Sequence, residues 1–386
     1  MESQALAGMR VIDLTQVMAG PFCTMLLADL GADVIKVEPP GGGDQTRHSW
    51  GRSGKGTDGS AFFALNRNKR SVVLDLRSDH DREKFYSLIG DADVVIENYR
   101  PGVADRLGID YDTLRELNPG LIYASISGFG QTGPYSQRPG YDLIAQGMSG
   151  VISVTGQPGA PPAKAGLPVA DLGAGMFCLY GILAAYVHKQ NTGEGQRLET
   201  SLFESALALS VWEATEYWAS GNVPRPTGTA HRMSAPYQAF KTRDSWMTIG
   251  ANNQRLWGFL CERIDRPELA DDPRFATNPD RMQHRDLLAS ILEETLGEND
   301  TDYWVERLLA GGVPAGPILD YAQVLDDDPH VRERKMVQTI PHPVEGEVKT
   351  LGFPVKFSAT PAKTLRHPPL LGEHESEIFG TSAEQS

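Results

Sequence analysis

The chain has 386 residues and a formal net charge of −14, with 40% hydrophobic and 22% charged residues. This length suggests about two domains, and the composition is typical of a globular protein. The negative charge repels polyanions, so we expect neither nucleic acid nor a membrane surface as a partner. No uncharged apolar run approaches the roughly 20 residues of a membrane span. The opening residues lack the basic segment of a signal peptide, so we expect a cytoplasmic protein.

Strand and helix patterns alternate through the first half of the chain. Strands are expected at 9–14, 32–38, 71–76, 91–98 and 120–128, and helices at 21–31, 81–90 and 110–118. This alternation predicts an α/β fold with a parallel sheet. Ligands of such sheets bind beyond the carboxyl ends of the strands.

The second half begins with an apolar helix at 172–188, a strand at 195–201 and a helix at 202–221. A linker rich in proline and glycine follows. It leads to a β-hairpin at 236–251, whose turn is centred on Arg243 and Asp244. We expect a small α+β domain at 221–324, with helices at 253–264, 283–297 and 301–310. The large domain then comprises 1–220 and 325–386, with strands in 336–357.

Positive charge gathers at the expected strand ends, in NRNKR at 66–70, at Arg77 and in NYRPGVADR at 98–106. These cations either decorate the surface or form an anion site, and both interpretations stay open. Familiar phosphate motifs are absent. GRSGKGT at 51–57 resembles a P-loop, but Ser49 stands where the first glycine is required.

Other catalytic motifs find no support either. DLGAGMFC at 171–178 reads G-x-G-x-x-C and so fails the dinucleotide motif G-x-G-x-x-G, and the chain has no G-x-S-x-G or H-E-x-x-H motif. Its cysteines, Cys23, Cys178 and Cys261, are far apart, so we expect neither a disulfide framework nor a metal site.

Asp171 is the most informative single residue. It lies in GLPVADLGAGMF, directly before the expected apolar helix, where an aspartate is a favoured N-cap. A helix start also favours an ionised carboxylate, and Gly173 and Gly175 allow a bulky substrate to approach the backbone. A carboxylate nucleophile requires that ionised state. The cap and the nucleophile are therefore compatible.

Many ordered segments resemble the family III CoA-transferases, which include formyl-CoA transferases and α-methylacyl-CoA racemases. They are LAGMRVIDLTQVMAGPFCTMLLADLGADVIKVEPPGGGD, NRNKRSVVLDL, ADVVIENYRPG, LIYASISGFGQTGP, GYDLIAQGMSG, GLPVADLGAG, GVPAGPI and PLLGEH. The resemblance implies a CoA-dependent enzyme with a Rossmann-like large domain, a smaller middle domain and an interlocked homodimer. It places Asp171 on the family's catalytic aspartate.

The resemblance also implies the chemistry and the ligand contacts. Asp171 would attack an acyl-CoA thioester and carry the acyl group and then CoA in turn, with a small carboxylic acid as acceptor. CoA is thus a substrate, and no prosthetic group is implied. The implied CoA contacts are Met18, Ala19, Leu74, Arg77, Asn98, Tyr99, Arg100, Arg106, Tyr141 and Asp142. The three arginines could meet phosphates, and Asn98 could hydrogen-bond adenine, ribose or pantetheine groups.

Two alternatives remain beside the transferase. A 2-methylacyl-CoA racemase needs an acid/base pair, and that branch resembles GHD where this chain has GYD at 140–142. The side chain of Tyr141 is a poor proton shuttle at neutral pH, because its ordinary pKa is about 10. A CoA-binding protein without chemistry is the other alternative.

Two departures from the family pattern concern the ligands. Pro39 replaces an arginine that some members carry, so a contact to adenine or phosphate must come from elsewhere or be weaker. Residues 228–254 lack the polyglycine run of formyl-CoA transferases, which makes oxalate and formate doubtful substrates.

Overall fold

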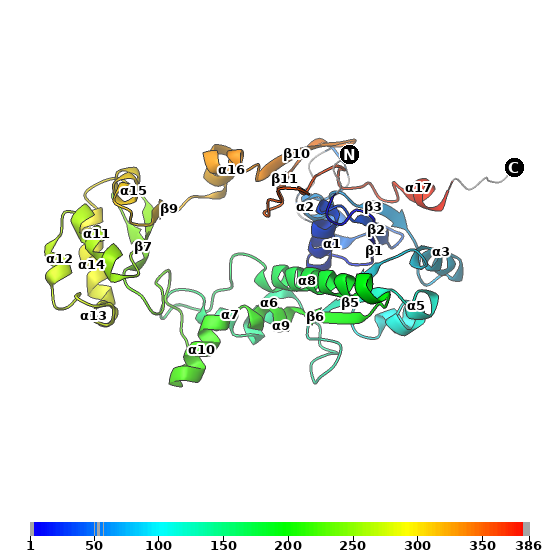
Figure 1. Cartoon of the computed structure of the whole chain (residues 1–386), viewed down its shortest axis with the longest axis horizontal. Coiled ribbons are helices and arrows are strands. Elements are labelled where there is room, and N and C mark those ends of the chain that lie inside the picture. The colour runs from blue at the N-terminus through cyan, green and yellow to red at the C-terminus, as the bar shows by residue number, and fades with distance from the viewer. Residues whose placement is uncertain (1–3, 50, 52–54, 57, 381–386) are drawn as a thin grey trace. The chain divides into compact units, whose positions relative to one another are not determined.

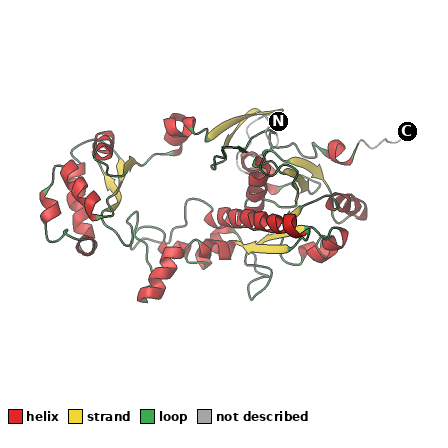
Figure 2. Ribbon diagram, in the orientation of Figure 1, coloured by secondary structure: helices red, strands yellow, loops and turns green. Residues whose placement is uncertain are grey.

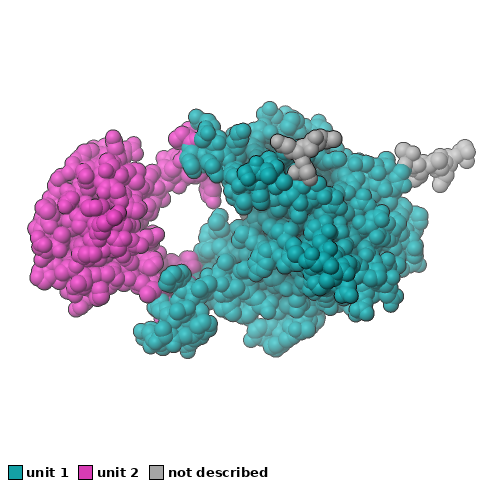
Figure 3. All heavy atoms as spheres, viewed as in Figure 1, with its two compact units in different colours: residues 1–152, 164–222, 330–386 teal, residues 153–163, 223–329 magenta. Residues whose placement is uncertain are grey.

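The computed structural model describes residues 4–49, 51, 55–56 and 58–380 (Figures 1 and 2). Part of the GRSGKGT segment therefore lies outside the described residues. The chain divides into two compact units, of which the first comprises 1–152, 164–222 and 330–386 (Figure 3). The second comprises 153–163 and 223–329. The segment 153–163, which the sequence assigned to the large domain, belongs to the second unit, where the amide of Gly228 donates to the carbonyl of Gly156 at 2.9 Å.

The first unit is built on a six-stranded sheet with the order β3-β2-β1-β4-β5-β6. Every neighbouring pair is parallel, as the alternation of strands and helices predicted. The strands are β1 (Arg10–Asp13), β2 (Asp33–Glu38), β3 (Arg70–Val73), β4 (Val94–Glu97), β5 (Ile122–Ser127) and β6 (Arg197–Ser201). The strand order reverses between β1 and β4, which is the switch point where such sheets bind ligands.

Buried side chains cover both faces of this sheet. Successive residues point to opposite faces, so Val11 joins one core and Ile12 the other. The first core includes α1 (Ala19–Asp29), α8 (Val169–Thr192) and α9 (Leu202–Ala208). The second core includes α3 (Asp79–Ile89) and α5 (Tyr111–Leu117).

Helix α8 is long and apolar enough to cross a membrane by length and composition alone. It is a core helix, because Ala174, Cys178 and Ile182 are buried in the first core. The opposite side of α8 exposes large apolar side chains, among them Tyr180 and Val187.

Further elements complete the first unit. The expected helix at 202–221 is wrong as a single element, because it is interrupted at Ser210, whose backbone is not helical. The other short elements are the 3₁₀ helix Gln45–His48, α2 (Ser60–Leu65), α4 (Val103–Leu107), α6 (Asp142–Met148), α10 (Val211–Ser220) and α17 (Glu375–Phe379). Two more, α7 (Val151–Val154) and α16 (Pro329–Glu333), have residues in both units. The strands expected in 336–357 form the antiparallel pair β10 (Val337–His342) and β11 (Gly346–Leu351).

The second unit has its own core around Phe240, Trp257 and Leu292. The predicted hairpin is present as β7 (Tyr237–Lys241) and β8 (Trp246–Gly250), and β9 (Ala315–Pro317) pairs with β8. The three expected helices form close to their predicted bounds. The helices are α11 (Gln254–Arg263), α12 (Glu268–Asp271), α13 (Asn278–Gln283), α14 (Arg285–Leu296) and α15 (Thr301–Ala310), and Gln323–Asp327 is a π-helix.

Candidate active site

A cavity of about 430 Å³ opens at the carboxyl ends of β1, β4 and β5. Its wall comes from the segments that follow these strands and from the start of α8, all within the first unit. The sheet therefore brings together side chains that are far apart in the sequence. Seven of the sequence-predicted site residues line this cavity: Met18, Ala19, Asn98, Tyr99, Arg100, Tyr141 and Asp171.

Leu74 and Arg77 line a neighbouring hollow of about 280 Å³ beyond β2 and β3. Gln16 and Tyr99 line both hollows, so the two are adjacent. The side chain of Arg77 is 77% exposed, and its Nε lies 2.8 Å from Oδ1 of Asp75. That exposed pair leaves Arg77 available to an anion that competes with Asp75.

Two predicted contacts lie elsewhere. Arg106 is an exposed residue of α4 and is not among the described residues that line either hollow. Asp142 serves the protein itself: its Oδ1 accepts from the amides of Ala170 at 2.9 Å and Asp171 at 3.4 Å. Its Oδ2 accepts from the side-chain amide of Gln146 at 2.6 Å.

The sequence suggested Asp171 as the N-cap of α8, but it is not the N-cap in the structure. Pro168 occupies that position, and the free amides of the first turn are satisfied by the carboxylate of Asp142 from α6. The side chain of Asp171 is thus released from capping. It is free to line the cavity.

Burial, and secondarily the charge of Asp142, raises the pKa of Asp171 to about 7. Among the hydrogen bonds of the described residues, none reaches its carboxylate oxygens, and no cation pairs with it. The helix start was expected to favour the ionised form of Asp171, but a pKa of about 7 leaves the carboxylate only partly ionised at neutral pH. Desolvation outweighs the helix dipole here, and the group is poised between its two protonation states.

Gly173 and Gly175 serve helix packing, whereas the sequence suggested access for a substrate. A Cβ added at Gly175 would lie 2.7 Å from the carbonyl oxygen of Ala19. One added at Gly173 would lie 3.3 Å from a methyl group of Leu209. Glycine at 175 thus lets α8 approach the start of α1, which brings Ala19 and Asp171 into one cavity.

The cations at 66–70 do not line the cavity but form ion pairs with other residues of the first unit. Arg67 pairs with Asp29 and Lys69 with Asp13, and both pairs are buried. This part of the apparent positive patch is structural. Sequence alone could not separate it from Arg100, which does line the cavity.

Sequence reasoning missed several cavity residues. Arg138 is one of them, and its guanidinium carbon stacks 3.9 Å from the ring centre of Tyr135. A signal existed, because Arg138 follows closely on the strand-end segment SGFGQTGPY. The other missed residues that matter below are Gln16 and Val17, which lie in the loop after β1.

The family model for CoA-transferase family III matches residues 6–375. The chain belongs to this family. It is 41% identical over 383 residues to succinyl-CoA:mesaconate CoA-transferase of Haloarcula hispanica, covering 97% of this chain and 96% of that protein. It is also 41% identical over 353 residues to acetyl-CoA:oxalate CoA-transferase of Acetobacter aceti, covering 91% of this chain and 88% of that protein.

A solved structure has the same fold. The crystal structure of a CaiB/BaiF family protein from Brucella suis superposes with a TM-score of 0.87 at 39% sequence identity. The match covers 97% of this chain and 98% of that one. The protein is thus a family III CoA-transferase, an enzyme of acyl-CoA metabolism that transfers CoA between carboxylic acids.

Proposed function

We propose that this family III CoA-transferase works through covalent intermediates on Asp171. The observation that carries the proposal is a half-buried carboxylate that accepts no hydrogen bond from the described residues and lines the cavity at the switch point of the sheet. A carboxylate that loses its hydration and gains no donor keeps its lone pairs for attack on a carbonyl carbon. Its pKa near 7 leaves about half of it ionised at neutral pH.

The proposed reaction has two halves. A carboxylate oxygen of Asp171 attacks the thioester carbonyl, the C–S bond breaks, and CoA thiolate leaves a mixed anhydride. The thiolate then attacks the aspartyl carbonyl and expels the donor acid, which leaves CoA on Asp171 as a thioester. The acceptor carboxylate reverses both steps: it forms a new anhydride, and the returning thiolate carries away its acyl group. No net proton is taken up or released.

The cavity supplies the other groups that this reaction needs. Met18 and Ala19 begin α1 with peptide groups that no side chain caps, next to the start of α8. Arg100 and Arg138 provide positive charge for the CoA phosphates or for a second carboxylate of the acid. Arg77 provides the same charge in the adjacent hollow. No prosthetic group takes part in this scheme.

We propose a dicarboxylic acid as the acceptor, because the two named relatives act on mesaconate and oxalate. The missing polyglycine run made oxalate a doubtful substrate, but the similarity to an oxalate CoA-transferase supports keeping oxalate among the acids to be tested. The two relatives use different donors at equal identity, so the donor requires a direct screen. Succinyl-CoA and acetyl-CoA should be offered against a panel of mono- and dicarboxylates, with CoA exchange followed by chromatography.

We also propose that the enzyme is a cytoplasmic homodimer. Large apolar side chains are exposed on the outer side of α8 and on α10, and Trp218 is 79% exposed. Trp212, Tyr217 and Tyr180 are exposed as well. Apolar surface of this kind usually contacts another chain. Light scattering should give twice the mass of one chain, and a monomer at micromolar concentration would contradict this proposal.

Asp171→Ala tests the catalytic proposal. We expect CoA transfer to fall by a factor of about 10³ or more, while CoA binding stays within error of the wild type and the thermal midpoint does not fall. Asp112→Ala is the matched control, because its carboxylate is 85% exposed on α5. Retention of most turnover by Asp171→Ala would refute the covalent mechanism.

The racemase alternative has a separate test. Tyr141 lines the cavity in the place where that branch carries a histidine, so the imidazole that would move the α-proton is missing there. We expect no solvent deuterium at the α-carbon of a 2-methylacyl-CoA after prolonged incubation. Deuterium incorporation at the rate of CoA transfer would favour the racemase.

A further inference from the structure

The loop after β1 contains a strained residue. Val17 has a φ of +72°, in the left-handed region that glycine favours and that a β-branched residue avoids. It lies directly before Met18 and Ala19, and all three residues line the cavity with Asp171. A conformation this unfavourable persists only where neighbouring groups hold it. The question is which groups hold Val17.

Asn98 holds the loop from the β4 side. Its side-chain oxygen accepts from the amide of Gln16 at 2.9 Å, and its side-chain nitrogen donates to the carbonyl of Gln16 at 2.7 Å. Both halves of the carboxamide are therefore engaged by one backbone residue. This arrangement differs from the ligand contact that the sequence suggested for Asn98.

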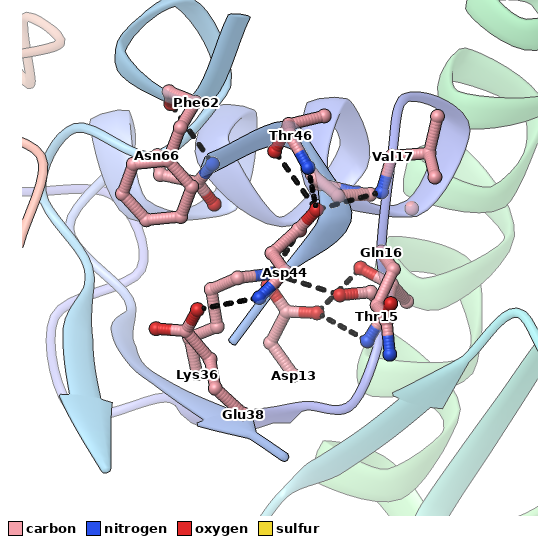
Figure 4. Close-up of polar contacts among 12 residues, drawn as sticks. Asp13, Thr15, Gln16, Val17, Lys36, Glu38, Asp44, Thr46, Phe62 and Asn66 are labelled. Atoms are coloured by element: carbon pink, nitrogen blue, oxygen red, sulfur yellow. Dashed lines mark hydrogen bonds and ion pairs between the residues drawn. The ribbon is translucent and has the colours of Figure 1, made fainter. Parts of the chain in front are cut away.

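Asp44 holds the loop from the other side, as Figure 4 shows. Its Oδ1 accepts from the amide of Val17 at 3.3 Å and from the amide of Thr46 at 2.9 Å. Its Oδ2 lies 2.9 Å from the ammonium of Lys36, which donates to the carbonyl of Thr15 at 2.7 Å. Three consecutive residues of the loop, Thr15, Gln16 and Val17, are thus each bound by side chains from outside the loop.

The groups behind the loop are costly to bury. Asp44 and Lys36 are fully buried, and so is Asp13, which accepts from the amide of Thr15 at 2.9 Å. Buried ion pairs of this kind add little stability compared with apolar residues of the same size. They do, however, fix a backbone in one conformation, since an incorrect loop would leave buried charges without partners.

We propose that Asn98 and Asp44 are positioning residues that hold Val17 in its left-handed conformation and thereby place Met18 and Ala19 in the wall of the active site. This inference rests on the proposed assignment of the cavity as the acyl-CoA site. It gives Asn98 a role through the protein backbone, where the resemblance implied a contact with CoA.

The test uses Asn98→Ala alone and combined with Val17→Gly. Glycine adopts a φ of +72° without strain, so the loop no longer needs the full clamp. Asn98→Ala should raise the KM for acyl-CoA about tenfold, which corresponds to the loss of one well-formed hydrogen-bonding group. Adding Val17→Gly should return KM to within about threefold of the wild type. A direct ligand contact or a general loss of stability would not be rescued by this glycine.

Asn118→Ala is the matched control. Asn118 also binds backbone, because its side-chain nitrogen donates to the carbonyls of Ile89 at 2.9 Å and Ala92 at 2.8 Å. These residues precede β4 and β5, so they lie at the amino ends of the strands, away from the cavity at the carboxyl ends. We expect it to lower the thermal midpoint as Asn98→Ala does while leaving KM unchanged. An Asn98→Ala defect that Val17→Gly does not relieve, or an equal KM effect from Asn118→Ala, would overturn the proposal.

Hydrogen exchange in the absence of substrate separates this inference from the proposed function. Amide exchange in a peptide spanning 14–24 should accelerate about tenfold in Asn98→Ala and in Asp44→Ala. Unchanged exchange overturns the clamp whatever the cavity binds. Faster exchange with unchanged KM and kcat instead overturns the assignment of the cavity. If Asp44→Ala does not fold, the Asn98 series alone decides the outcome.

Discussion

The fully buried carboxylates of Asp13 and Asp44 and the half-buried carboxylate of Asp171, all in the first unit, differ in the partners that the protein gives to their charge. Behind the loop after β1, Asp13 and Asp44 are surrounded by lysines and hydrogen-bond donors. Burial opposes their ionisation, but these partners lower the pKa of both. At the start of α8, Asp171 has no such partner, and burial raises its pKa to about 7.

The contrast separates carboxylates that hold the loop after β1 in place from the carboxylate that we propose as the nucleophile. A carboxylate whose oxygens accept hydrogen bonds from backbone amides fixes that backbone, and one whose oxygens accept none can attack a carbonyl carbon. The first-turn amides of α8, those of Ala170 and Asp171, donate to the carboxylate of Asp142, so they are not left for the carboxylate of Asp171. Each prediction below removes or titrates a carboxylate of one of these two kinds.

The largest effect is expected for Asp13→Ala. This change leaves the ammonium of Lys69, 3.0 Å from the lost carboxylate, buried without its charged partner. Burial already lowers the pKa of Lys69 to about 8 even with Asp13 present. We expect chemical denaturation to show a loss of about 3–5 kcal/mol. Asp75→Ala, which removes the partly exposed partner of the exposed Arg77, should leave the free energy of unfolding within error.

The pH dependence of activity should be nearly as large. The pKa of Asp171 is raised to about 7, so the reactive ionised form is lost as the pH falls. We expect kcat/KM for acyl-CoA to fall about tenfold per unit below pH 7, or about a hundredfold by pH 5. Steady-state rates with the thermal midpoint recorded at each pH will separate titration from unfolding. A profile that is flat down to pH 5 would contradict the raised pKa.

A smaller effect, of opposite sign, is expected for the stability of Asp171→Asn. The folded protein binds a proton at Asp171 more tightly than the unfolded chain does, so wild-type stability falls as the pH rises from about 4 to about 7. Asparagine avoids this penalty. We expect the variant to gain about 1–3 kcal/mol at pH 8 and almost nothing at pH 4. A gain at pH 4 equal to that at pH 8 would show that the charge is not the cause.

Local patterns predicted the sheet because the alternation of short strands and helices persists over the first 200 residues. The carboxyl ends of the strands then identified the site region, and seven predicted residues share one cavity. Asp171 stood out because a lone carboxylate precedes a long apolar helix. The resemblance of the ordered segments to the family implied a catalytic role for it.

What the sequence could not provide depends on contacts between distant residues. Asp142 caps α8 from 29 positions away, and this contact decides that Asp171 is not a cap. Asn98 binds a loop 82 positions earlier, which no local pattern indicates. Gly175 looked like an opening for substrate, but the carbonyl of Ala19 occupies that space. In each case the sequence-based interpretation used only neighbouring residues, whereas the partner that decides the role lies far away in the chain.

The covalent role of Asp171 is tested most directly by trapping it. The enzyme should be incubated with succinyl-CoA or acetyl-CoA, treated with hydroxylamine, and digested for peptide mass spectrometry. Our account predicts a hydroxamate on the peptide that contains Asp171, formed only with acyl-CoA present and absent from Asp171→Asn. An unmodified Asp171 in enzyme that is turning over, or a hydroxamate at another carboxylate, would contradict it.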